Sequence, residues 1–417
     1  MDTFKKAANQ LTYQRRLEEK TVKKLRLAVF NTQPPHLYFG GVERRIMETA
    51  KRLTSDVVTT VFSGTKKGFT KPAAVGGVGL VPCFSTDKLF PVDNWFFNHT
   101  VAGAADTIQA DVYEAHAVSG YGFQKALRKR GIKKPFILTV HGVLADEYFQ
   151  AAQRGSLSTR EKLANLIMYR LSRLEAESAR NANAIVTVSY YSAKKLVQLY
   201  RVDAEKIRVV PNGVDLDRFK PAPSGEELKR QIGVDDRQCI LFVGRLIPRK
   251  GLSYLIEAAQ RIVKERVDTA FVIVGDGPLR KQLTVNIERL GLSKNFLFLG
   301  DVSDKILPAL YNCSDVFAFP SIQEGLGIAL LEAQATAKPV VAFNVSGVRE
   351  AVLDKETGLL VNMNSGELAD AILRLLSDKS LRERMGRRGR EFVSDRLSWD
   401  ACARGMLKVY QEAENLL

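Results

Sequence analysis

Residues 315–350 read DVFAFPSIQEGLGIALLEAQATAKPVVAFNVSGVRE. The apolar run Val316–Phe319 predicts a strand, and the apolar segment after Gly327 predicts a helix that carries Glu332. A second strand is expected at Pro339–Phe343. A strand, a glycine-containing loop, a helix and another strand, in this order, are typical of a parallel α/β sheet.

The loop and the start of this helix have the features of a ligand site. Gly325 and Gly327 let a ligand approach the backbone closely. The free N–H groups of a first helical turn favour a phosphate. Glu324 and Glu332 are spaced so that both can face the same ligand, and a carboxylate accepts two hydrogen bonds from vicinal hydroxyls. The pattern therefore predicts a nucleotide sugar as the ligand.

The context of the two glutamates gives a resemblance to a known family. Glu324 and Glu332 enclose the sequence GLGIALL, and this motif lies between FAFPS and PVVAF. It resembles the donor site of retaining glycosyltransferases of the GT-B fold, family 4. The resemblance covers about residues 25–415 and is most specific in 240–350. It implies two Rossmann-like, doubly wound parallel-sheet domains that face a central cleft.

The length of the chain agrees with more than one domain. A chain of 417 residues is too long for a single core. With the resemblance, we expect an N-terminal basic extension (1–24), an acceptor-binding domain (25–214), a nucleotide-sugar domain (215–395) and a C-terminal helix (396–417). The last helix is expected to pack back on the N-terminal domain.

Composition favours a cytoplasmic protein. Apolar residues make up 45% of the chain, and no stretch approaches the roughly 18 apolar residues of a membrane span. The charged N-terminus has no apolar signal core. The scattered cysteines predict reduced core thiols rather than a disulfide or zinc framework. They are Cys83, Cys239, Cys313 and Cys402.

The net charge of +16 is concentrated in the N-terminal half. Residues 1–214 hold 33 Lys and Arg against 18 Asp and Glu, whereas residues 215–417 hold 29 against 28. QKALRKRGIKK (124–134) contains six cations and no acid, and Arg170 and Arg173 add to the excess. An anionic partner is expected: the inner face of a membrane, a phosphorylated acceptor, or nucleic acid.

Nucleic acid is the weakest of these three partners. A single-strand binder needs aromatic side chains on strands among basic residues, and the sequence shows no such arrangement. We therefore expect no nucleic-acid partner. Peripheral attachment to a membrane and a lipid-linked or anionic acceptor remain as the expectations.

Short apolar runs alternate with helical or irregular segments along both halves, which predicts the strands of parallel sheets. In the first half the strands are expected at Leu25–Asn31, Val57–Phe62, Val78–Pro82, Asp111–Glu114, Phe136–Val140, Ile185–Val188 and Ile207–Val210. In the second half the strands are expected in the segments 239–251, 271–278, 295–300 and 356–361, besides the two within 315–350.

The segment LFPVDNWFFN (89–98) is interpreted as loop-like and rich in aromatic residues. Its five large apolar side chains are Leu89, Phe90, Trp95, Phe96 and Phe97. One interpretation is core packing beneath a helix. The other is an apolar lip that meets a lipid acceptor or a bilayer.

Two histidines and a glycine pair mark the ligand edge of the N-terminal domain. His141 ends the strand FILTVHG, where α/β sheets bind ligands, and His116 follows DVYEA. His141 resembles the family's active-site histidine, which lies beside the transferred sugar. Each histidine could instead be a hydrogen-bonded residue at a strand end. The Gly40–Gly41 helix start resembles the family's glycine loop near the donor phosphate.

The second half contains a pair of cations at a strand end. Arg245 and Lys250 in G-R-x-x-x-x-K-G resemble the family's diphosphate clamp. Two cations stabilise the negative charge that develops on a departing nucleoside diphosphate. Gly275 and Val302 occupy positions that in the family lie near the nucleobase. Asp215 and Asp217 lie in the expected hinge, so we do not interpret them as a metal site.

The resemblance thus implies a set of site residues, with no metal and no cofactor besides the nucleotide sugar. The catalytic residues are His141, Glu324, Arg245 and Lys250. The donor-binding residues are Gly41, Arg245, Lys250, Gly275, Val302, Glu324, Gly325, Leu326, Gly327, Ile328 and Glu332.

The function implied is transfer of a hexose from UDP- or GDP-hexose, with retention, to a lipid-linked, anionic or polysaccharide acceptor. No carboxylate is required under the anomeric carbon, unlike in retaining hydrolases, so same-face attack is expected. The alternative is another GT-B activity, such as a nucleotide-sugar epimerase or a phosphorylase. A product assay without an acceptor separates these.

Overall fold

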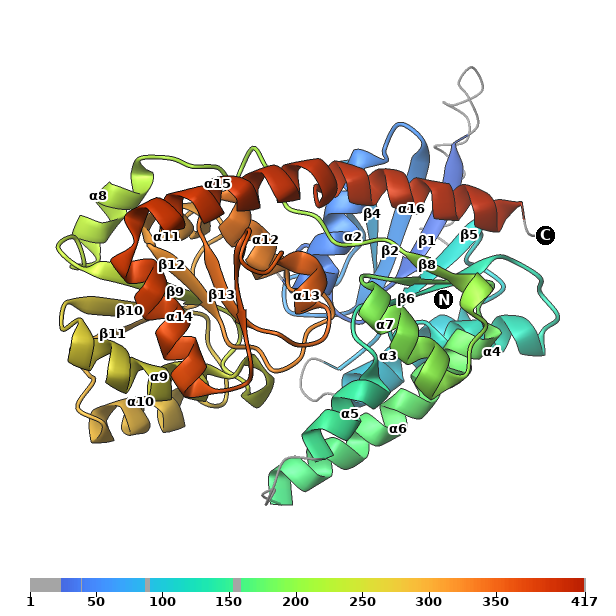
Figure 1. Cartoon of the computed structure of the whole chain (residues 1–417). Coiled ribbons are helices and arrows are strands. Elements are labelled where there is room, and N and C mark those ends of the chain that lie inside the picture. Colours follow the sequence, from blue (N-terminus) through green and yellow to red (C-terminus); the bar gives the residue numbers. More distant parts are fainter. Residues whose placement is uncertain (1–23, 39, 87–90, 153–158, 416–417) are drawn as a thin grey trace. The chain divides into compact units, whose positions relative to one another are not determined.

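The computed structural model describes residues 24–38, 40–86, 91–152 and 159–415. The chain divides into two compact units: unit 1 comprises residues up to Pro211 together with Asp400–Leu417, and unit 2 comprises Asn212–Trp399. Figure 1 shows one sheet in each unit. The extension expected at 1–24 lies outside the described residues except for Lys24.

Unit 1 is built on an eight-stranded sheet with the order β3-β4-β2-β1-β5-β6-β7-β8. All neighbouring strands are parallel except β3, which pairs antiparallel with β4 and which the sequence did not predict. The strands are β1 (Leu25–Phe30), β2 (Val57–Gly64), β3 (Ala73–Val75), β4 (Val78–Cys83), β5 (Val112–His116), β6 (Phe136–Val140), β7 (Ala184–Thr187) and β8 (Ile207–Val209).

Helices flank the sheet of unit 1. Its helices are α2 (Gly41–Arg52), α3 (Val92–Gly103), α4 (Tyr121–Lys129), α5 (Leu144–Ala152), α6 (Thr159–Asn181), α7 (Tyr190–Lys195) and α16 (Trp399–Glu414), with a π-helix at Leu196–Tyr200 and a 3-10 turn at Ala204–Lys206. In α2 the residues Ile46, Met47 and Ala50 are buried at helical spacing.

The prediction of a loop at 89–98 is wrong from Val92 onward, because Val92–Gly103 forms helix α3. Leu89 and Phe90 lie outside the described residues. Phe97 is buried in the core, whereas the side chain of Trp95 is 62% exposed. Successive aromatic residues thus point to different sides of the helix, which a loop interpretation could not anticipate.

Unit 2 contains a six-stranded parallel sheet with the order β11-β10-β9-β12-β13-β14. The strands are β9 (Gln238–Val243), β10 (Thr269–Val274), β11 (Phe296–Gly300), β12 (Val316–Phe319), β13 (Val340–Phe343) and β14 (Gly358–Val361). Every residue of β12 and β13 is buried. Central parallel strands are covered on both faces, which is why they appear as unbroken apolar runs in the sequence.

The helices of unit 2 connect these strands. They are α8 (Ser224–Gln231), α9 (Leu252–Glu265), α10 (Arg280–Arg289), α11 (Leu307–Cys313), α12 (Ile328–Ala335), α13 (Val348–Ala351), α14 (Ser365–Ser377) and α15 (Lys379–Arg396), with a 3-10 turn at Pro248–Lys250. No described helix is both apolar and long enough to cross a bilayer.

The predicted fold class is confirmed: both units are α/β structures on parallel sheets, apart from the antiparallel edge strand β3. The boundaries between the two compact units lie after Pro211 and after Trp399, whereas the predicted domain boundaries lie at 214 and 395. Residues 400–417 belong to unit 1. There, Met406, Val409 and Tyr410 of α16 are buried. The four cysteines are buried free thiols.

Candidate active site

Three charged side chains gather in unit 2 where β9 and β12 end. The Nζ of Lys250 lies 2.6 Å from Oε1 of Glu324, and Nη1 of Arg249 lies 3.2 Å from the same oxygen. Arg249 also donates to the backbone oxygen of Gln323 at 2.9 Å. The 3-10 turn at Pro248–Lys250 therefore presents two adjacent cations to the loop after β12.

Glu324 is ionised in this cluster. Its burial raises the pKa, but the nearby ammonium of Lys250 and guanidinium of Arg249 outweigh that effect, so the pKa lies below its ordinary value. The two cations are themselves partly exposed, with 16% of the Lys250 side chain and 29% of the Arg249 side chain accessible. They can therefore reach a ligand phosphate while they hold the carboxylate.

The structure brings together only one of the two cations predicted as a clamp. Lys250 contacts Glu324, but the side chain of Arg245 is exposed and makes no hydrogen bond or ion pair with any residue that the structure describes. Arg249, which the sequence interpretation did not select, takes the place beside Lys250. The signal was present in PRKG, because a turn at the carboxyl end of a parallel strand points its side chains to the ligand edge.

Helix α12 begins directly after this loop. Gly327 has a φ of 95°, a region that favours glycine, and an added Cβ would lie 2.9 Å from Cδ1 of Leu330. No side chain caps this helix, so its first-turn N–H groups can bind an anion, apart from that of Leu330, which donates to the backbone oxygen of Gly327. Gly325, Leu326 and Ile328 surround this helix start, as the predicted phosphate-binding segment requires.

Glu332 is held by a different partner from Glu324. Its side chain is buried in α12, and Oε2 accepts a hydrogen bond of 2.7 Å from the hydroxyl of Tyr311. The two glutamates of the predicted motif thus lie in separate networks, one cationic and one phenolic. Tyr311 orients the carboxylate that we expect to bind the ribose.

The predicted nucleobase region contains a close backbone crossing. Gly275 follows β10 with a φ of 113°, and an added Cβ would lie 2.2 Å from the backbone oxygen of Gly244. This approach requires glycine, because any side chain would displace the turn that leads to Lys250. Val302 lies two residues after β11 and is half-buried. Their roles in base binding remain predictions.

In unit 1 the two histidines are adjacent. Nδ1 of His116 lies 2.9 Å from Nε2 of His141, and the rings are stacked. His116 ends β5 and His141 follows β6, so neighbouring parallel strands place both at the carboxyl edge. His116 is buried and His141 is half-buried.

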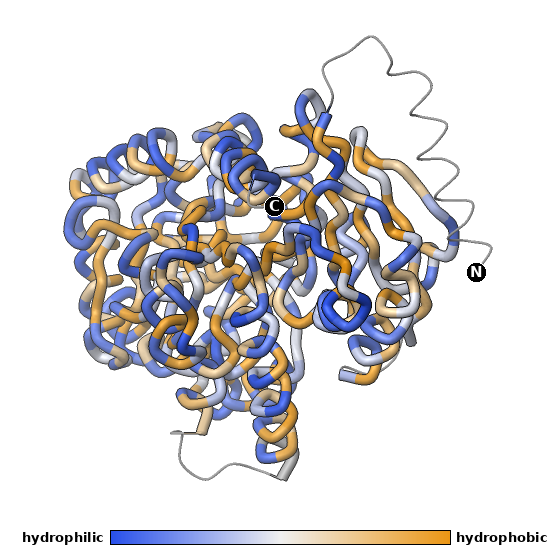
Figure 2. The backbone as a smooth tube through the Cα atoms, turned by 90° about the vertical axis from the view of Figure 1, so that its right-hand side faces the viewer, coloured by the Kyte–Doolittle hydropathy of each residue, from blue (hydrophilic) through white to orange (hydrophobic). Residues whose placement is uncertain are grey.

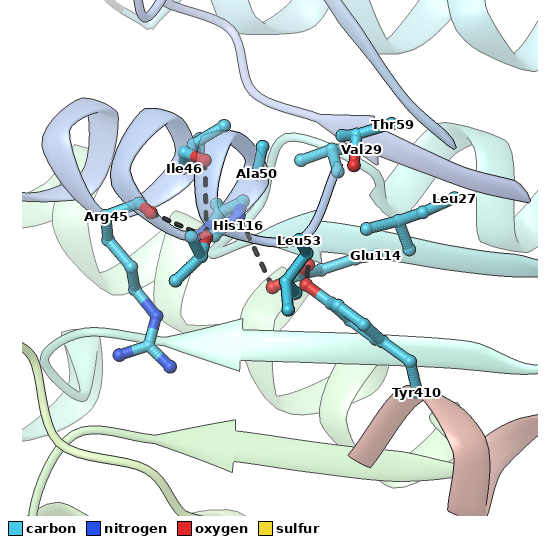
Figure 3. Close-up of a pocket in the computed structure, with 11 residues that line it drawn as sticks. Leu27, Val29, Arg45, Ile46, Ala50, Leu53, Thr59, Glu114, His116 and Tyr410 are labelled. Atoms are coloured by element: carbon cyan, nitrogen blue, oxygen red, sulfur yellow. Dashed lines mark hydrogen bonds and ion pairs between the residues drawn. The ribbon is translucent and has the colours of Figure 1, made fainter. Parts of the chain in front are cut away.

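A buried carboxylate supports this pair from behind. Oε1 of Glu114 lies 3.5 Å from Nε2 of His116 and accepts a hydrogen bond of 2.6 Å from Thr139. Oε2 of Glu114 accepts a hydrogen bond of 2.6 Å from the hydroxyl of Tyr410 in α16. A chain of contacts therefore runs from the C-terminal helix through Glu114 and His116 to His141 (Figure 3 shows its first three members).

Both histidines are neutral at physiological pH. Burial lowers the pKa of His116 to about 3, and the buried Arg45 contributes in the same direction. Burial also lowers the pKa of His141 well below its ordinary value, with further contributions from His116 and Arg45. A neutral imidazole can orient a sugar hydroxyl by hydrogen bonding without placing a positive charge beside the anomeric centre.

The cavity beside this chain of side-chain contacts is too small for a substrate. Its volume is about 10 Å³, which suits about one water molecule. The hydroxyl of Thr59 lines it and has no partner among the described protein atoms. Figure 3 shows that Arg45, Glu114, His116 and Tyr410 share this space with apolar side chains of β1 and α2.

The start of helix α2 places a carboxylate beside the predicted glycine loop. The helix does begin at Gly41, but an added Cβ on Gly40 would lie within van der Waals overlap of the Glu43 carboxylate. Asn31 holds that carboxylate by a hydrogen bond of 3.2 Å. Because a carboxylate repels a phosphate, donor binding at Gly41 would require Glu43 to move.

The side chain of Asp215 has a structural role. Oδ1 of Asp215 accepts hydrogen bonds from the backbone N–H groups of Asp217 and Arg218. Within the described part of the chain, no group of three or more His, Cys, Asp or Glu side chains is arranged to hold a metal ion.

Comparison with known protein families matches most of the chain. Residues 39–218 match the model of Glycosyltransferase Family 4, and residues 224–392 match that of Glycosyl transferases group 1. The junction between the two matched segments lies beside the division between the two units.

Two relatives illustrate the range of similar proteins. The alpha-D-kanosaminyltransferase of Streptomyces kanamyceticus is 32% identical over 242 residues, which cover 57% of this chain and 62% of the relative. The GDP-mannose-dependent alpha-(1-6)-phosphatidylinositol monomannoside mannosyltransferase of Mycobacterium tuberculosis is 36% identical over 231 residues, covering 53% and 60%. The matches thus span less than two thirds of each relative.

Among solved structures, the sucrose-phosphate synthase of Thermosynechococcus elongatus has a TM-score of 0.81. The sequences are 20% identical, and the match covers 93% of this chain and 99% of that protein. This similarity supports the fold of the chain.

Proposed function

Because the chain belongs to the glycosyltransferases, with a Family 4 segment followed by a group 1 segment, we propose that it transfers a hexose from UDP- or GDP-hexose to an acceptor. The observation that carries the proposal is the cluster of Lys250, Arg249 and Glu324 in front of the uncapped helix α12. Such a site offers cations and amides to a diphosphate and a carboxylate to sugar hydroxyls.

The residues of unit 2 are assigned as follows. Lys250 and Arg249 neutralise the diphosphate as its bond to the sugar breaks. Glu324 binds sugar hydroxyls, and it keeps the two cations in place before the donor arrives. Glu332, oriented by Tyr311, binds the ribose.

In unit 1, His141 orients the transferred sugar. The reaction is proposed to proceed with retention by same-face attack, in which the leaving phosphate takes the acceptor proton. Because Lys250 and Arg249 supply positive charge at the diphosphate, no bound metal is assigned. Activity that is unchanged by a chelator supports this part of the proposal, and activity restored only by a divalent ion contradicts it.

The acceptor is proposed to be lipid-linked, anionic or a polysaccharide, met at the inner face of a membrane. The basic excess of residues 1–214 supports an anionic acceptor. The name of the mycobacterial relative, which pairs a GDP-mannose donor with a phosphatidylinositol acceptor, supports a lipid.

The first test is thermal unfolding of the full chain with UDP, GDP, ADP, TDP and their hexose conjugates. A ligand present at 100 times its dissociation constant stabilises the folded state by about 2.7 kcal/mol. Stabilisation by one nucleotide family, followed by sugar transfer from that donor to lipid extract, supports the proposal. Absence of transfer from every donor that binds contradicts it, and conversion of the donor without acceptor indicates an epimerase or a phosphorylase.

A further inference from the structure

Exposed apolar side chains are unevenly distributed between the two units. Of the sixteen exposed large hydrophobic residues that the structure describes, twelve lie in unit 1 and four in unit 2. Single exposed hydrophobic residues are normal, whereas neighbouring ones mark an interaction site. In unit 1 one such group is formed by helices α5 and α6.

Helix α6 is longer than the strands of the unit 1 sheet. Its 23 residues span about 35 Å, whereas a strand of four residues such as β7 spans about 13 Å. Six of the side chains in 171–179 are buried, but none of those in 162–170 is. Figure 1 shows the paired helices α5 and α6 extending past the sheet. We name residues 148–152 and 162–170 the overhang.

The overhang presents large apolar side chains to solvent. The exposed fractions are 49% for Phe149, 59% for Leu163, 53% for Leu166 and 39% for Tyr169. The ring of Tyr148 contacts the rings of both Phe149 and Tyr169, which joins the two helices into one surface. Figure 2 shows hydrophobic and hydrophilic residues interleaved along this pair of helices.

The charges on the overhang have one sign. Residues 162–174 of α6 contain three cations, Lys162, Arg170 and Arg173, and no acid. All three cations are exposed, and Arg173 lies over the ring of Tyr169. The acids of α5, Asp146 and Glu147, lie in its first turn at the base of the overhang. Apolar side chains between cations are the pattern of a helix that lies in the interface of an anionic bilayer.

We propose that the overhang, through Phe149, Leu163, Leu166 and Tyr169 with Lys162, Arg170 and the adjoining Arg173, docks this chain on an anionic lipid membrane. The aromatic and leucine side chains enter the headgroup region, and the cations bind lipid phosphates. A second copy of the chain is disfavoured as the occupant because two faces of the same positive charge repel each other.

The location of the overhang connects membrane docking with acceptor binding. Helix α5 begins at Leu144, three residues after His141, so the overhang rises from the edge where His116 and His141 lie. A lipid-linked acceptor in the docked membrane would therefore be presented near His141. This role in acceptor binding rests on the proposed function, whereas membrane docking itself is tested without any glycosyl transfer.

The experiment is flotation of the full chain with vesicles of phosphatidylcholine alone or mixed with phosphatidylglycerol. We expect the chain to float with the mixed vesicles and to be released by salt. The double variant Leu163→Ser, Leu166→Ser should lower partitioning at least about tenfold, because the apolar contribution is lost. The double variant Arg170→Gln, Arg173→Gln should lower it by about fivefold for each cation.

Matched controls come from unit 2. Val267→Ser with Val285→Ser removes two exposed apolar side chains, and Arg384→Gln with Arg387→Gln removes the same charge as the arginine pair. Both controls should float like the unaltered chain. Equal losses in the controls, no flotation of the unaltered chain, or a concentration-dependent dimer that the leucine variants dissociate would overturn the proposal.

Nucleotide stabilisation measured on the same proteins separates the two proposals. Variants that bind UDP or GDP normally but do not float show that only docking has failed. A chain that floats but binds no nucleotide retains the docking surface and loses the proposed function.

Discussion

At the residue scale, one carboxylate, Glu324, connects the predicted sugar site with the predicted phosphate site. It accepts from Lys250 and pairs with Arg249, so the donor must meet a salt bridge that already exists. The phosphates compete with Glu324 for these cations. Nucleotide binding therefore depends on Lys250 and Arg249, whereas sugar transfer also depends on Glu324.

The first prediction concerns Lys250. The variant Lys250→Ala should weaken binding of the nucleoside diphosphate by about 10- to 100-fold, because a charge-assisted hydrogen bond is lost. Titration calorimetry on the full chain measures the change. Arg249→Ala should have a similar effect, whereas Arg245→Ala should have little effect, since the exposed Arg245 side chain makes no ion pair with Glu324. The reverse ranking of the two arginines would restore the clamp expected from the sequence.

The second prediction concerns the charge of Glu324. The variant Glu324→Gln should lower turnover by about 100-fold or more, because an oriented acceptor of the sugar hydroxyls is lost. Affinity for the nucleoside diphosphate should stay equal or increase, since Lys250 and Arg249 lose their competing carboxylate. Turnover and nucleotide affinity are measured on the same preparation. A fully active variant would show that the sugar does not bind at Glu324.

At the element scale, the start of helix α5 depends on a buried acid of α6. Oε2 of Glu175 accepts from the backbone N–H of Leu144 at 3.0 Å and from the hydroxyl of Tyr200 at 2.5 Å. Oε1 of Glu175 is buried without a hydrogen-bond partner among the described residues. Burial raises the pKa of this carboxyl to about 7. The base of the overhang is therefore sensitive to pH.

The third prediction follows from this pKa. Below pH 4.5 Glu175 is protonated in both the folded and unfolded states, so it carries no ionisation penalty. Between pH 4.5 and about 7 the unfolded state binds fewer protons than the folded state. The free energy of unfolding therefore falls over this interval, by up to about 3 kcal/mol.

The variant Glu175→Gln should lack this component. Urea unfolding of both proteins between pH 4.5 and 8 measures the difference, which should change in favour of the variant as the pH rises. Glu177→Gln, on the same helix but in a half-buried position, serves as the control. A difference that is constant across this range would contradict the raised pKa.

At the scale of the whole molecule, the last helix completes the interior of unit 1. Tyr410 of α16 donates to Glu114, 296 positions earlier in the chain, and Arg45 donates to the backbone oxygen of Val210. Residues 400–417 thus belong to unit 1, although the whole of unit 2 separates them from it in sequence. Glu114 in turn faces His116, so the end of the chain supports the histidine pair.

The fourth prediction tests this long-range contact. The variant Tyr410→Phe should lower the free energy of unfolding by about 1–3 kcal/mol, because one oxygen of a buried carboxylate loses its donor. Thermal and urea unfolding of the full chain measure the loss. Tyr169→Phe removes the same hydroxyl from a residue that is 39% exposed and should leave stability unchanged. Equal stability of both variants would show that the Tyr410–Glu114 hydrogen bond does not stabilise the folded state.

The sequence by itself determined the parallel strands, the glycine turns and the glutamate motif. Periodicity and apolar runs are local properties, and central strands such as β12 are apolar on both faces, so their pattern survives without knowledge of the fold. The same reasoning placed Lys250, Gly327 and His141 at strand ends, where ligands bind.

The tertiary structure alone decided which side chains meet. Arg249 rather than Arg245 stands beside Lys250, the Glu43 carboxylate lies at the start of α2, and Tyr410 reaches Glu114. Turn geometry and contacts between distant segments determine these pairings, and neither leaves a periodic signal in the sequence. The apolar segment after Leu89 became helix α3 for the same reason, because packing rather than local pattern selected its conformation.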